Sequence, residues 1–172
     1  MMIQYIEDGM TQPADKGVIP YLMHFGEIKI SPEVLRLDEK GYAVVRRREG
    51  LNMHEYIERR CEVPKDVCIS LARKIAYINK YDVRHGIFTP RNVVMAEGNG
   101  PVIIDWKDAL IGDPDGSDVE TFLAGCKENG INGKFEKLFR QEYDRELRRQ
   151  RILTDEQIME KYNKLLESCQ TV

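Results

Sequence analysis

The sequence predicts an α+β domain that is mainly helical, with most of its strands in the first part of the chain. Two observations support this class. Residues up to about Gly50 carry short apolar or alternating runs, which are typical of strands, whereas most later apolar residues recur at helical spacing. The length of 172 residues fits one domain, or one domain with a small extension. We therefore expect a β-rich part over residues 1–50 and a helical part over residues 51–172.

Composition excludes several classes of protein. The chain is 42% hydrophobic and 32% charged, with only 13 Gly and 7 Pro, which disfavours collagen-like and disordered chains. No stretch approaches the roughly 20 apolar residues that cross a bilayer, and the start MMIQYIEDGM lacks a basic end followed by an apolar run. We expect no membrane association and a cytoplasmic or nuclear location, with secretion left open should a signal have been removed.

Charge and cysteine content narrow the chemistry further. The formal charge of −3 and the pI near 5.7 disfavour nucleic acid as a partner. The cysteines are scattered without a CxxC pair, so we predict reduced, mostly packed thiols rather than a zinc site or a disulfide framework. These are Cys61, Cys68, Cys126 and Cys169.

Two segments of the first part predict a small antiparallel unit. Residues 18–25 form an apolar run that favours a strand. Residues 42–46 favour a second strand, because they follow the turn signal Asp38-Glu-Lys-Gly41.

Helices are predicted from residue 52 onward. A short helix over residues 52–60 begins at Asn52 as its N-cap. The clearest helix follows Pro64, where Val67, Leu71, Ile75 and Ile78 recur at helical spacing. Later helices are expected from Ser117 or Asp118, over residues 135–147, and after the capping-box pair of Thr154 and Gln157.

A loop and a hairpin separate the clearest helix from the later ones. The loop, marked by Gly86 and Pro90, is His85-Gly-Ile-Phe-Thr-Pro-Arg-Asn92. Two apolar runs follow, over residues 93–95 and 101–105, and Glu97-Gly-Asn-Gly100 between them is typical of a hairpin turn. The second run ends at Asp105.

This order of elements resembles the C-terminal lobe of the protein-kinase-like fold. The pattern is similar to the branch that includes aminoglycoside and choline phosphotransferases and many fungal kinase-like proteins. The loop HGDxxPxN of that branch stands here as residues 85–92, and its IDW motif stands as Ile104-Asp-Trp106. The resemblance implies that residues 1–50 are a reduced antiparallel remnant of the N-terminal lobe with the hinge, and that residues 51–172 form the kinase-like C-terminal lobe.

The resemblance also implies roles for the loop residues. In that branch the motifs serve phosphoryl transfer, so Asn92 and Asp105 would hold Mg²⁺ against the phosphates of ATP. His85, Gly86 and Pro90 would shape the loop. From the residues alone, Asn92 is equally well explained as an amide that bonds its own loop, and Asp105 as a carboxylate that caps the next turn.

Two departures from the family disfavour catalysis. The family places its catalytic Asp directly after HG, where this chain has Ile87, whose side chain cannot accept a proton. No GxGxxG stands before the predicted hinge. We therefore expect a truncated pseudokinase with no catalytic residue and no cofactor, which binds another protein, such as a kinase or a kinase partner. The alternative is a small phosphotransferase that uses ATP and Mg²⁺.

Partner binding is expected at two places. An apolar face left by the reduced lobe would favour self-association into a homodimer. The run Arg46, Arg47 and Arg48 is a candidate site for an acidic partner peptide. The arginines over residues 140–151 alternate with acidic residues, which is typical of a solvated, ion-paired helix face and makes nucleic-acid binding unlikely.

Overall fold

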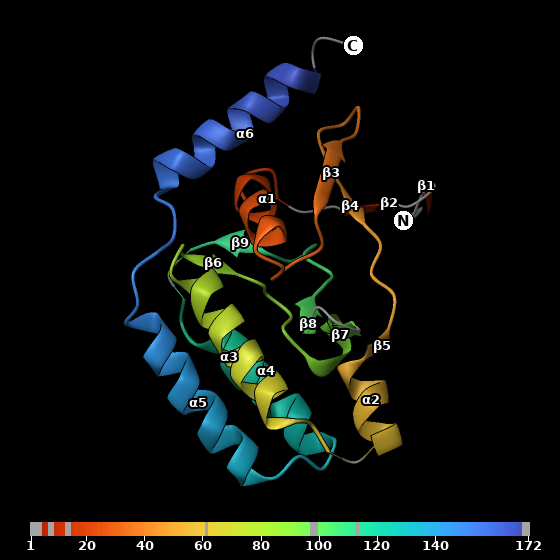
Figure 1. Cartoon of the computed structure of the whole chain (residues 1–172), viewed down its shortest axis with the longest axis vertical. Helices are drawn as coiled ribbons and strands as arrows, with labels where there is room; N and C mark the ends of the chain where they lie inside the picture. The colour runs from red at the N-terminus through yellow and green to blue at the C-terminus, as the bar shows by residue number, and fades with distance from the viewer. Residues whose placement is uncertain are drawn as a thin grey trace.

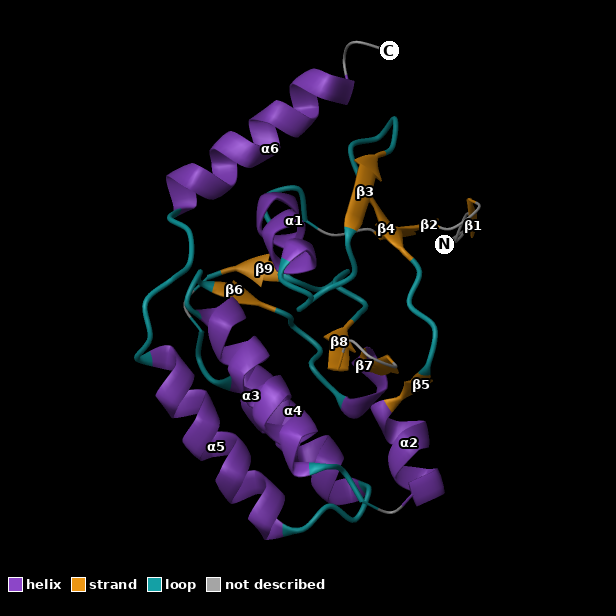
Figure 2. Cartoon of the chain, viewed as in Figure 1, coloured by secondary structure: helices purple, strands orange, loops and turns teal. Residues whose placement is uncertain are grey.

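The computed structural model describes residues 5–6, 9–12, 15–60, 62–96, 100–112 and 114–169, without the side chains of 5–6, 9–12 and 169. It is an α+β fold that combines helices with small antiparallel sheets (Figures 1 and 2). The helices are α1 (Ile19–Glu27), α2 (Met53–Arg60), α3 (Lys65–Asn79), the 3₁₀ turn η1 (Pro90–Asn92), α4 (Ser117–Glu128), α5 (Gly133–Leu147) and α6 (Asp155–Cys169). The strands are β1 (Tyr5–Ile6), β2 (Gly9–Gln12), β3 (Val34–Leu37), β4 (Ala43–Arg46), β5 (Leu51–Asn52), β6 (Val83–Arg84), β7 (Val93–Ala96), β8 (Gly100–Ile103) and β9 (Leu110–Ile111).

The first part of the chain forms an antiparallel sheet in the order β1-β2-β4-β3, in which the strand predicted over residues 42–46 is β4. The turn between β3 and β4 is built on Asp38, whose carboxylate accepts hydrogen bonds from the backbone N–H groups of Lys40 and Tyr42 at 2.9 and 2.8 Å. Such an Asp side chain stabilises a tight turn by pairing amides that the strands leave free. The turn signal of the sequence is thereby confirmed.

The strand predicted over residues 18–25 is wrong, because these residues belong to α1. Proline stands in the first turn of the helix, where its missing N–H costs no hydrogen bond. Val18, Leu22 and Phe25 lie at helical spacing and are almost fully buried. Since Ile19, Pro20 and His24 are buried as well, the helix is apolar nearly all round and its sequence shows no amphipathic pattern.

The other predicted helices are confirmed, and the caps predicted at Asn52 and Thr154 form. Asn52 Oδ1 accepts from the N–H of Glu55 at 2.9 Å, while the Glu55 carboxylate accepts from the N–H of Asn52 at 3.0 Å, which is a capping box at the start of α2. Thr154 and Gln157 form the same reciprocal pair before α6. In α3 the predicted stripe is buried in the core.

The hairpin of β7 and β8 is also confirmed. Val93 pairs with Ile103 and Ala96 with Gly100 in an antiparallel register, and β5 adds to the β7 edge. Residues 97–99 of the predicted turn lie outside the described residues. A third pair, β6 with β9, flanks the loop at residues 85–92.

One aromatic cluster joins the helices to this loop. Phe88 stacks on Phe122 of α4 with ring centroids 4.5 Å apart, and Phe122 lies 5.1 Å from Phe139 of α5. Trp106, which follows β8, is fully buried and lies 5.9 Å from Phe25 of α1. The loop is therefore attached to the core from both sides.

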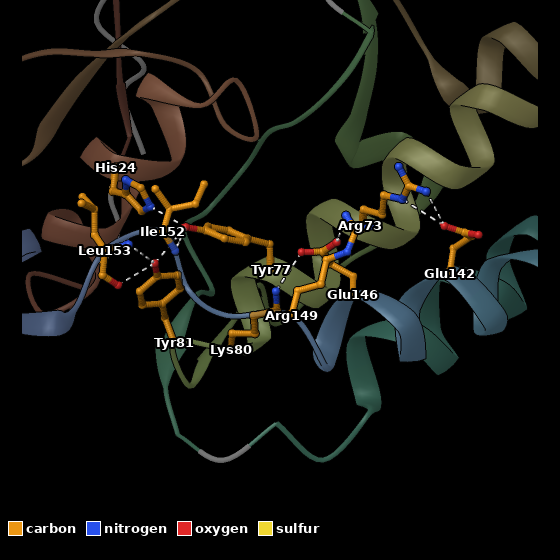
Figure 3. A network of polar contacts seen from close by, with 10 residues as sticks. All are labelled: His24, Arg73, Tyr77, Lys80, Tyr81, Glu142, Glu146, Arg149, Ile152 and Leu153. Carbon is orange, nitrogen blue, oxygen red and sulfur yellow. Dashed lines mark hydrogen bonds and ion pairs between the residues drawn. The ribbon is translucent and has the colours of Figure 1, made fainter.

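The segment between α5 and α6 is held by a chain of buried hydrogen bonds (Figure 3). The Tyr81 hydroxyl donates to the carbonyl of Leu153 at 3.0 Å, so the Tyr77 hydroxyl donates to Tyr81 at 2.8 Å. His24 Nε2 then donates to Tyr77 at 2.8 Å. The N–H of Ile152 donates to the hydroxyl oxygen of Tyr77, and the N–H of Leu153 donates to that of Tyr81. We call this chain the tyrosine clasp.

The clasp positions α6 across α1 (Figure 1). Ile158 of α6 is buried, and Lys161 pairs with Glu27 of α1 at 2.5 Å. Next to the clasp, Lys80, which follows α3, pairs with Glu146 of α5 at 2.8 Å (Figure 3). Polar contacts thus join α1 to α6 at the surface and the end of α3 to α5 in a half-buried position, in addition to apolar packing.

Two cysteines can be placed. Cys68 and Cys126 are buried free thiols, and burial raises the pKa of Cys68 to about 12 and that of Cys126 further. This agrees with the expectation of reduced, packed thiols; nothing is described of the side chains of Cys61 and Cys169. Within the described ranges, no helix has the length and apolar character needed to cross a membrane.

Candidate functional site

The loop at residues 85–92 is organised around buried His85. Its Nε2–H donates to the carbonyl oxygen of Ile104 at 2.8 Å, which connects the loop to the end of the hairpin. The ring also lies 4.9 Å from the ring of Trp106. Burial lowers the pKa of His85, so the ring is neutral at physiological pH. A buried neutral imidazole with this partner fits the structural role expected for His85.

Asp118 of α4 binds the backbone at the start of the loop. Its carboxylate is almost fully buried and accepts hydrogen bonds from the N–H groups of His85 and Gly86 at 2.8 and 3.0 Å. The sequence predicts Asp118 only as a possible helix start, and its role in the loop was not predicted. No sequence signal separates these two roles, because the contact joins positions 33 and 32 residues apart.

Gly86 and Pro90 allow the loop to pack closely. Gly86 has φ of 89°, and a Cβ there would lie 2.3 Å from the carbonyl oxygen of Asp108. Only glycine fits such a position without moving the backbone. Pro90 is buried, and its ring packs where a side chain at Gly125 of α4 would stand. Both positions are thus in close contact with the neighbouring segments.

Ile87 lies at the solvent-facing turn of this loop. Its side chain is 45% exposed, although its neighbour Phe88 is fully buried. An exposed hydrocarbon can neither take up a proton nor orient a hydroxyl. At the position where the resembled family carries its catalytic Asp, this chain thus presents an apolar surface.

The two candidate metal ligands lie on adjacent segments. The N–H of Ile104 donates to the backbone carbonyl of Asn92 at 2.8 Å, which places Asn92 beside the residue that precedes Asp105. The Asn92 amide donates to the carbonyl of Ile87 at 2.8 Å. The predicted alternative for Asn92, a bond to its own loop, therefore forms. That bond uses Nδ2 only, so Oδ1 keeps its capacity as a ligand.

Asp105 is the less regular of the two residues. Its φ is 61°, a left-handed conformation that is uncommon outside glycine, asparagine and aspartate. Its carboxylate is 40% exposed and lies 3.6 Å from Lys107 Nζ. A carboxylate and an amide oxygen are suitable donors for Mg²⁺. The donor set thus fits a weakly held cation, with the ammonium of Lys107 as a competing positive charge.

A second candidate site lies where β4 leads into α2. Here the structure forms a groove of about 650 Å³ behind the segment that links the first sheet to the helical part. Its lining includes three arginines and one glutamate and therefore carries a net charge of +2. The lining residues are Arg47, Arg48, Glu49, Gly50, Leu51, Tyr56, Arg60, Met95 and Ala96. We call this the arginine groove.

The cations of the groove come from different elements. Arg47 and Arg48 follow β4, whereas Arg60 ends α2 and lies over the ring of Tyr56 at 5.3 Å. Gly50, with φ of 140°, allows the linking segment to approach β7, because a Cβ there would meet the carbonyl of Met95 at 2.7 Å. The contributions of Tyr56 and Arg60 were missed in the sequence, where only the run of arginines stood out.

Arg46 does not share the surroundings of Arg48. It is the last residue of β4, and its Nε donates to the carboxylate of Glu33 at 2.9 Å on the exposed surface. Arg48 Nε is enclosed, and within the described part of the chain neither Arg48 nor Arg60 forms an ion pair with an acidic side chain. The predicted run Arg46 to Arg48 is therefore divided: only its last two residues line the groove.

A half-buried lysine adds positive charge beside Arg48. Lys74 of α3 donates through Nζ to the carbonyls of Lys29 and Pro101 at 2.7 and 2.5 Å. Burial, and to a smaller extent the positive charges of Arg48 and Lys29, together lower the pKa of Lys74 to about 8. The positive charge of Lys74 thus adds to the positive electrostatic potential around Arg48.

Comparison with known proteins gives little further guidance. No family model matches the chain, and neither does any curated protein. Among solved structures, the chain is similar to a protein described as monomeric WbdD, with a TM-score of 0.49 and 17% sequence identity. The match covers 64% of this chain and 32% of that one, so the chain spans about a third of that protein's length. This likeness assigns neither a family nor an activity to the chain.

Proposed function

We propose that this chain is a non-catalytic, kinase-like module that acts by binding another protein. The observation that carries the proposal is Ile87. The loop around it has the close packing that phosphotransfer loops need, through His85, Gly86 and Asp118, but the side chain at its solvent-facing turn is a hydrocarbon. A positioned acid or base contributes about 10²–10⁴-fold to such reactions. Its replacement favours recognition over catalysis.

The surroundings of Ile87 support the same proposal. Leu110 and Ile111 of β9 are exposed apolar side chains, and β9 pairs with β6, the strand that leads into the loop. Exposed apolar side chains on neighbouring segments favour contact with another macromolecule. The proposed partner is a protein, such as a kinase or a kinase partner, or a second copy of this chain. Light scattering over a range of concentrations separates these cases: a concentration-dependent dimer identifies self-association.

A second candidate function is a small phosphotransferase that uses ATP and Mg²⁺. It is favoured by one observation, the adjacency of Asn92 and Asp105 through the bond between Ile104 and Asn92. Phosphoryl transfer depends mostly on positioning and on charge neutralisation by the metal, so it can proceed without a dedicated base. In this case Asn92 and Asp105 would hold the cation, which would neutralise charge on the phosphates.

A thermal-shift titration with ATP and Mg²⁺ decides between the two functions. The non-catalytic module predicts no saturable stabilisation at millimolar nucleotide and no transfer or release of the γ-phosphate. The phosphotransferase predicts stabilisation that is lost in Asp105→Ala and kept in Asp108→Ala, an acidic residue nearby in the sequence that was not assigned as a ligand. Such a result would overturn the non-catalytic proposal.

A further inference from the structure

The arginine groove has the properties of a site for an acidic ligand. Three guanidinium groups line one hollow, and among the described lining residues Glu49 is the one acidic side chain. Guanidinium groups bind carboxylates through two parallel hydrogen bonds, which makes arginine well suited to recognising acidic segments. The positions of Arg48 and Arg60 on separate elements allow more than one carboxylate to be bound at once.

Two of these cations, Arg48 and Arg60, have no acidic partner among the residues that the structure describes. Elsewhere in the described residues, arginines of the surface commonly pair with acids of their own chain, such as Arg140 with Glu120 and Glu136. By contrast, Arg48 and Arg60 have no such pair in the described part of the chain, and Arg48 Nε is enclosed without a hydrogen-bond acceptor there. A buried donor without an acceptor costs about 1–3 kcal/mol. An acidic ligand would pair with the terminal nitrogens of the Arg48 guanidinium, because the Nε itself is enclosed.

The size and lining of the groove indicate a peptide rather than a small ion. Its volume of about 650 Å³ greatly exceeds that of a single anion, and it has apolar surface beside the cations. Leu51, Met95 and the ring of Tyr56 provide that surface. A segment that alternates acidic and apolar side chains would therefore match both features of the lining.

We propose that the arginine groove binds an acidic peptide segment of a partner protein, whose carboxylates pair with Arg48 and Arg60 while an apolar side chain packs against Tyr56 and Met95. This inference rests on the proposed function as a protein-binding module, and it names the chemistry of the partner. Binding releases Arg48 from its unpaired state and offsets the repulsion between Arg48 and Lys74. The interaction weakens with salt, because its charges lie near the surface.

The test uses the full chain and a fluorescein-labelled peptide in which pairs of glutamates alternate with leucine and phenylalanine. Fluorescence anisotropy is measured at two salt concentrations. The control peptide carries glutamine at each glutamate. We expect the acidic peptide to bind, with weaker binding at higher salt, and the glutamine peptide to bind at least about fivefold more weakly, the loss of about 1 kcal/mol expected for a charge-assisted pair.

Matched variants show whether the groove is responsible. Arg48→Gln and Arg60→Gln each weaken peptide binding by at least about fivefold. Arg48→Lys keeps the charge but loses the planar fork, so it has an intermediate effect. Arg36→Gln is the control, since it makes the same charge change on an exposed residue of β3 outside the groove. Circular dichroism spectra and unfolding curves show that each variant is folded.

Several outcomes would overturn the inference. Equal binding of the glutamine peptide would make the groove an apolar site, and an equal loss in Arg36→Gln would reduce the effect to overall charge. Displacement of the peptide by millimolar inorganic phosphate would indicate a small-anion site. Equal, Arg48-dependent binding of polyuridylic acid would indicate RNA. Absence of peptide binding together with absence of ATP binding would overturn only the groove, whereas phosphotransfer would overturn the proposed function.

Discussion

The loop at residues 85–92 and the arginine groove differ in how their polar groups are paired. In the loop, the N–H groups of His85 and Gly86 donate to the carboxylate of Asp118, and the Asn92 amide donates to the carbonyl of Ile87. In the groove, Arg48 and Arg60 have no acidic partner among the described residues. Internal pairing makes the loop a rigid part of the fold. Because Arg48 and Arg60 are not paired with an acid in the described part of the chain, their guanidinium groups remain able to bind carboxylates of another molecule.

This contrast separates structural from functional polarity. A polar cluster whose bonds are closed within the chain stabilises one conformation, and its removal lowers stability. A cluster whose donors have no acceptor within the chain contributes little to the free energy of unfolding, so replacing its residues mainly affects binding. Each of the following experiments tests one side of this distinction.

The largest effect is expected at Asp118. Replacing Asp118 by Ala leaves the buried N–H groups of His85 and Gly86 without acceptors, at a cost of about 3 kcal/mol in the free energy of unfolding. Asp118→Asn keeps one oxygen acceptor and should lose less. Urea denaturation measures both. A loss below about 0.5 kcal/mol in Asp118→Ala would show that the loop does not depend on this carboxylate.

The pH dependence of stability tests the two buried histidines. Burial lowers the pKa of both His24 and His85 below the ordinary value of 6.5. The unfolded chain therefore binds more protons than the folded chain below about pH 6.5, and stability is present above that pH and is lost as the pH falls toward the folded-state values. The slope for each histidine is at most about 1.4 kcal/mol per pH unit.

Unfolding in urea at pH 7.5 and 5.5 measures this loss. His24→Gln removes one titrating group and should give a smaller difference between the two pH values than the parent chain. Lys74, whose pKa is about 8, stays mostly protonated in this range and contributes only a small part of the loss, in the same direction as the histidines. A parent chain equally stable at both pH values would contradict the prediction that both histidines are neutral in the fold.

The tyrosine clasp should show a smaller effect. Tyr77→Phe removes the hydroxyl that bonds His24, Tyr81 and Ile152, with an expected loss of about 1–2 kcal/mol. The segment between α5 and α6 should also become more sensitive to trypsin at Arg149 and Arg151. Tyr162→Phe is the matched control, since no hydrogen bond of its hydroxyl is described. Equal cleavage rates for both variants would mean that the clasp does not hold the segment.

Much of the fold followed from local patterns. The capping boxes at Asn52 and Thr154 and the apolar stripe of α3 were correct because each depends on residues three or four apart. The first helix was not predicted, because nearly all of its residues are buried and an apolar run without a polar face is equally compatible with a strand. Its partners, α6 and the tyrosine clasp, are more than 50 residues away in the sequence.

The sites divide in the same manner. The sequence was sufficient to single out the loop residues, and the structure brings Asn92 and Asp105 onto adjacent segments. Asp118, Tyr56 and Arg60 could not be found, because their roles depend on contacts between distant segments. The run of arginines suggested one surface, yet β4 ends at Arg46, which pairs with Glu33, and the segment that follows the strand carries Arg47 and Arg48 to the groove.

The smallest effects, and the most direct test of the contrast, concern these two arginines. Arg46→Gln breaks an exposed ion pair with Glu33 and should lower the free energy of unfolding by no more than about 0.5 kcal/mol. Arg48→Gln removes a cation that has no acidic partner and that repels Lys74, so it should leave stability unchanged or raise it by about 0.5 kcal/mol. It should also raise the pKa of Lys74 above about 8, which NMR titration of the lysine side chain measures. If Arg48→Gln lowered stability more than Arg46→Gln did, Arg48 would be a structural residue, and the groove would stabilise the fold as the polar groups of the loop do. A stability that rises while binding of the acidic peptide falls would instead show that the chain keeps this arginine for its partner.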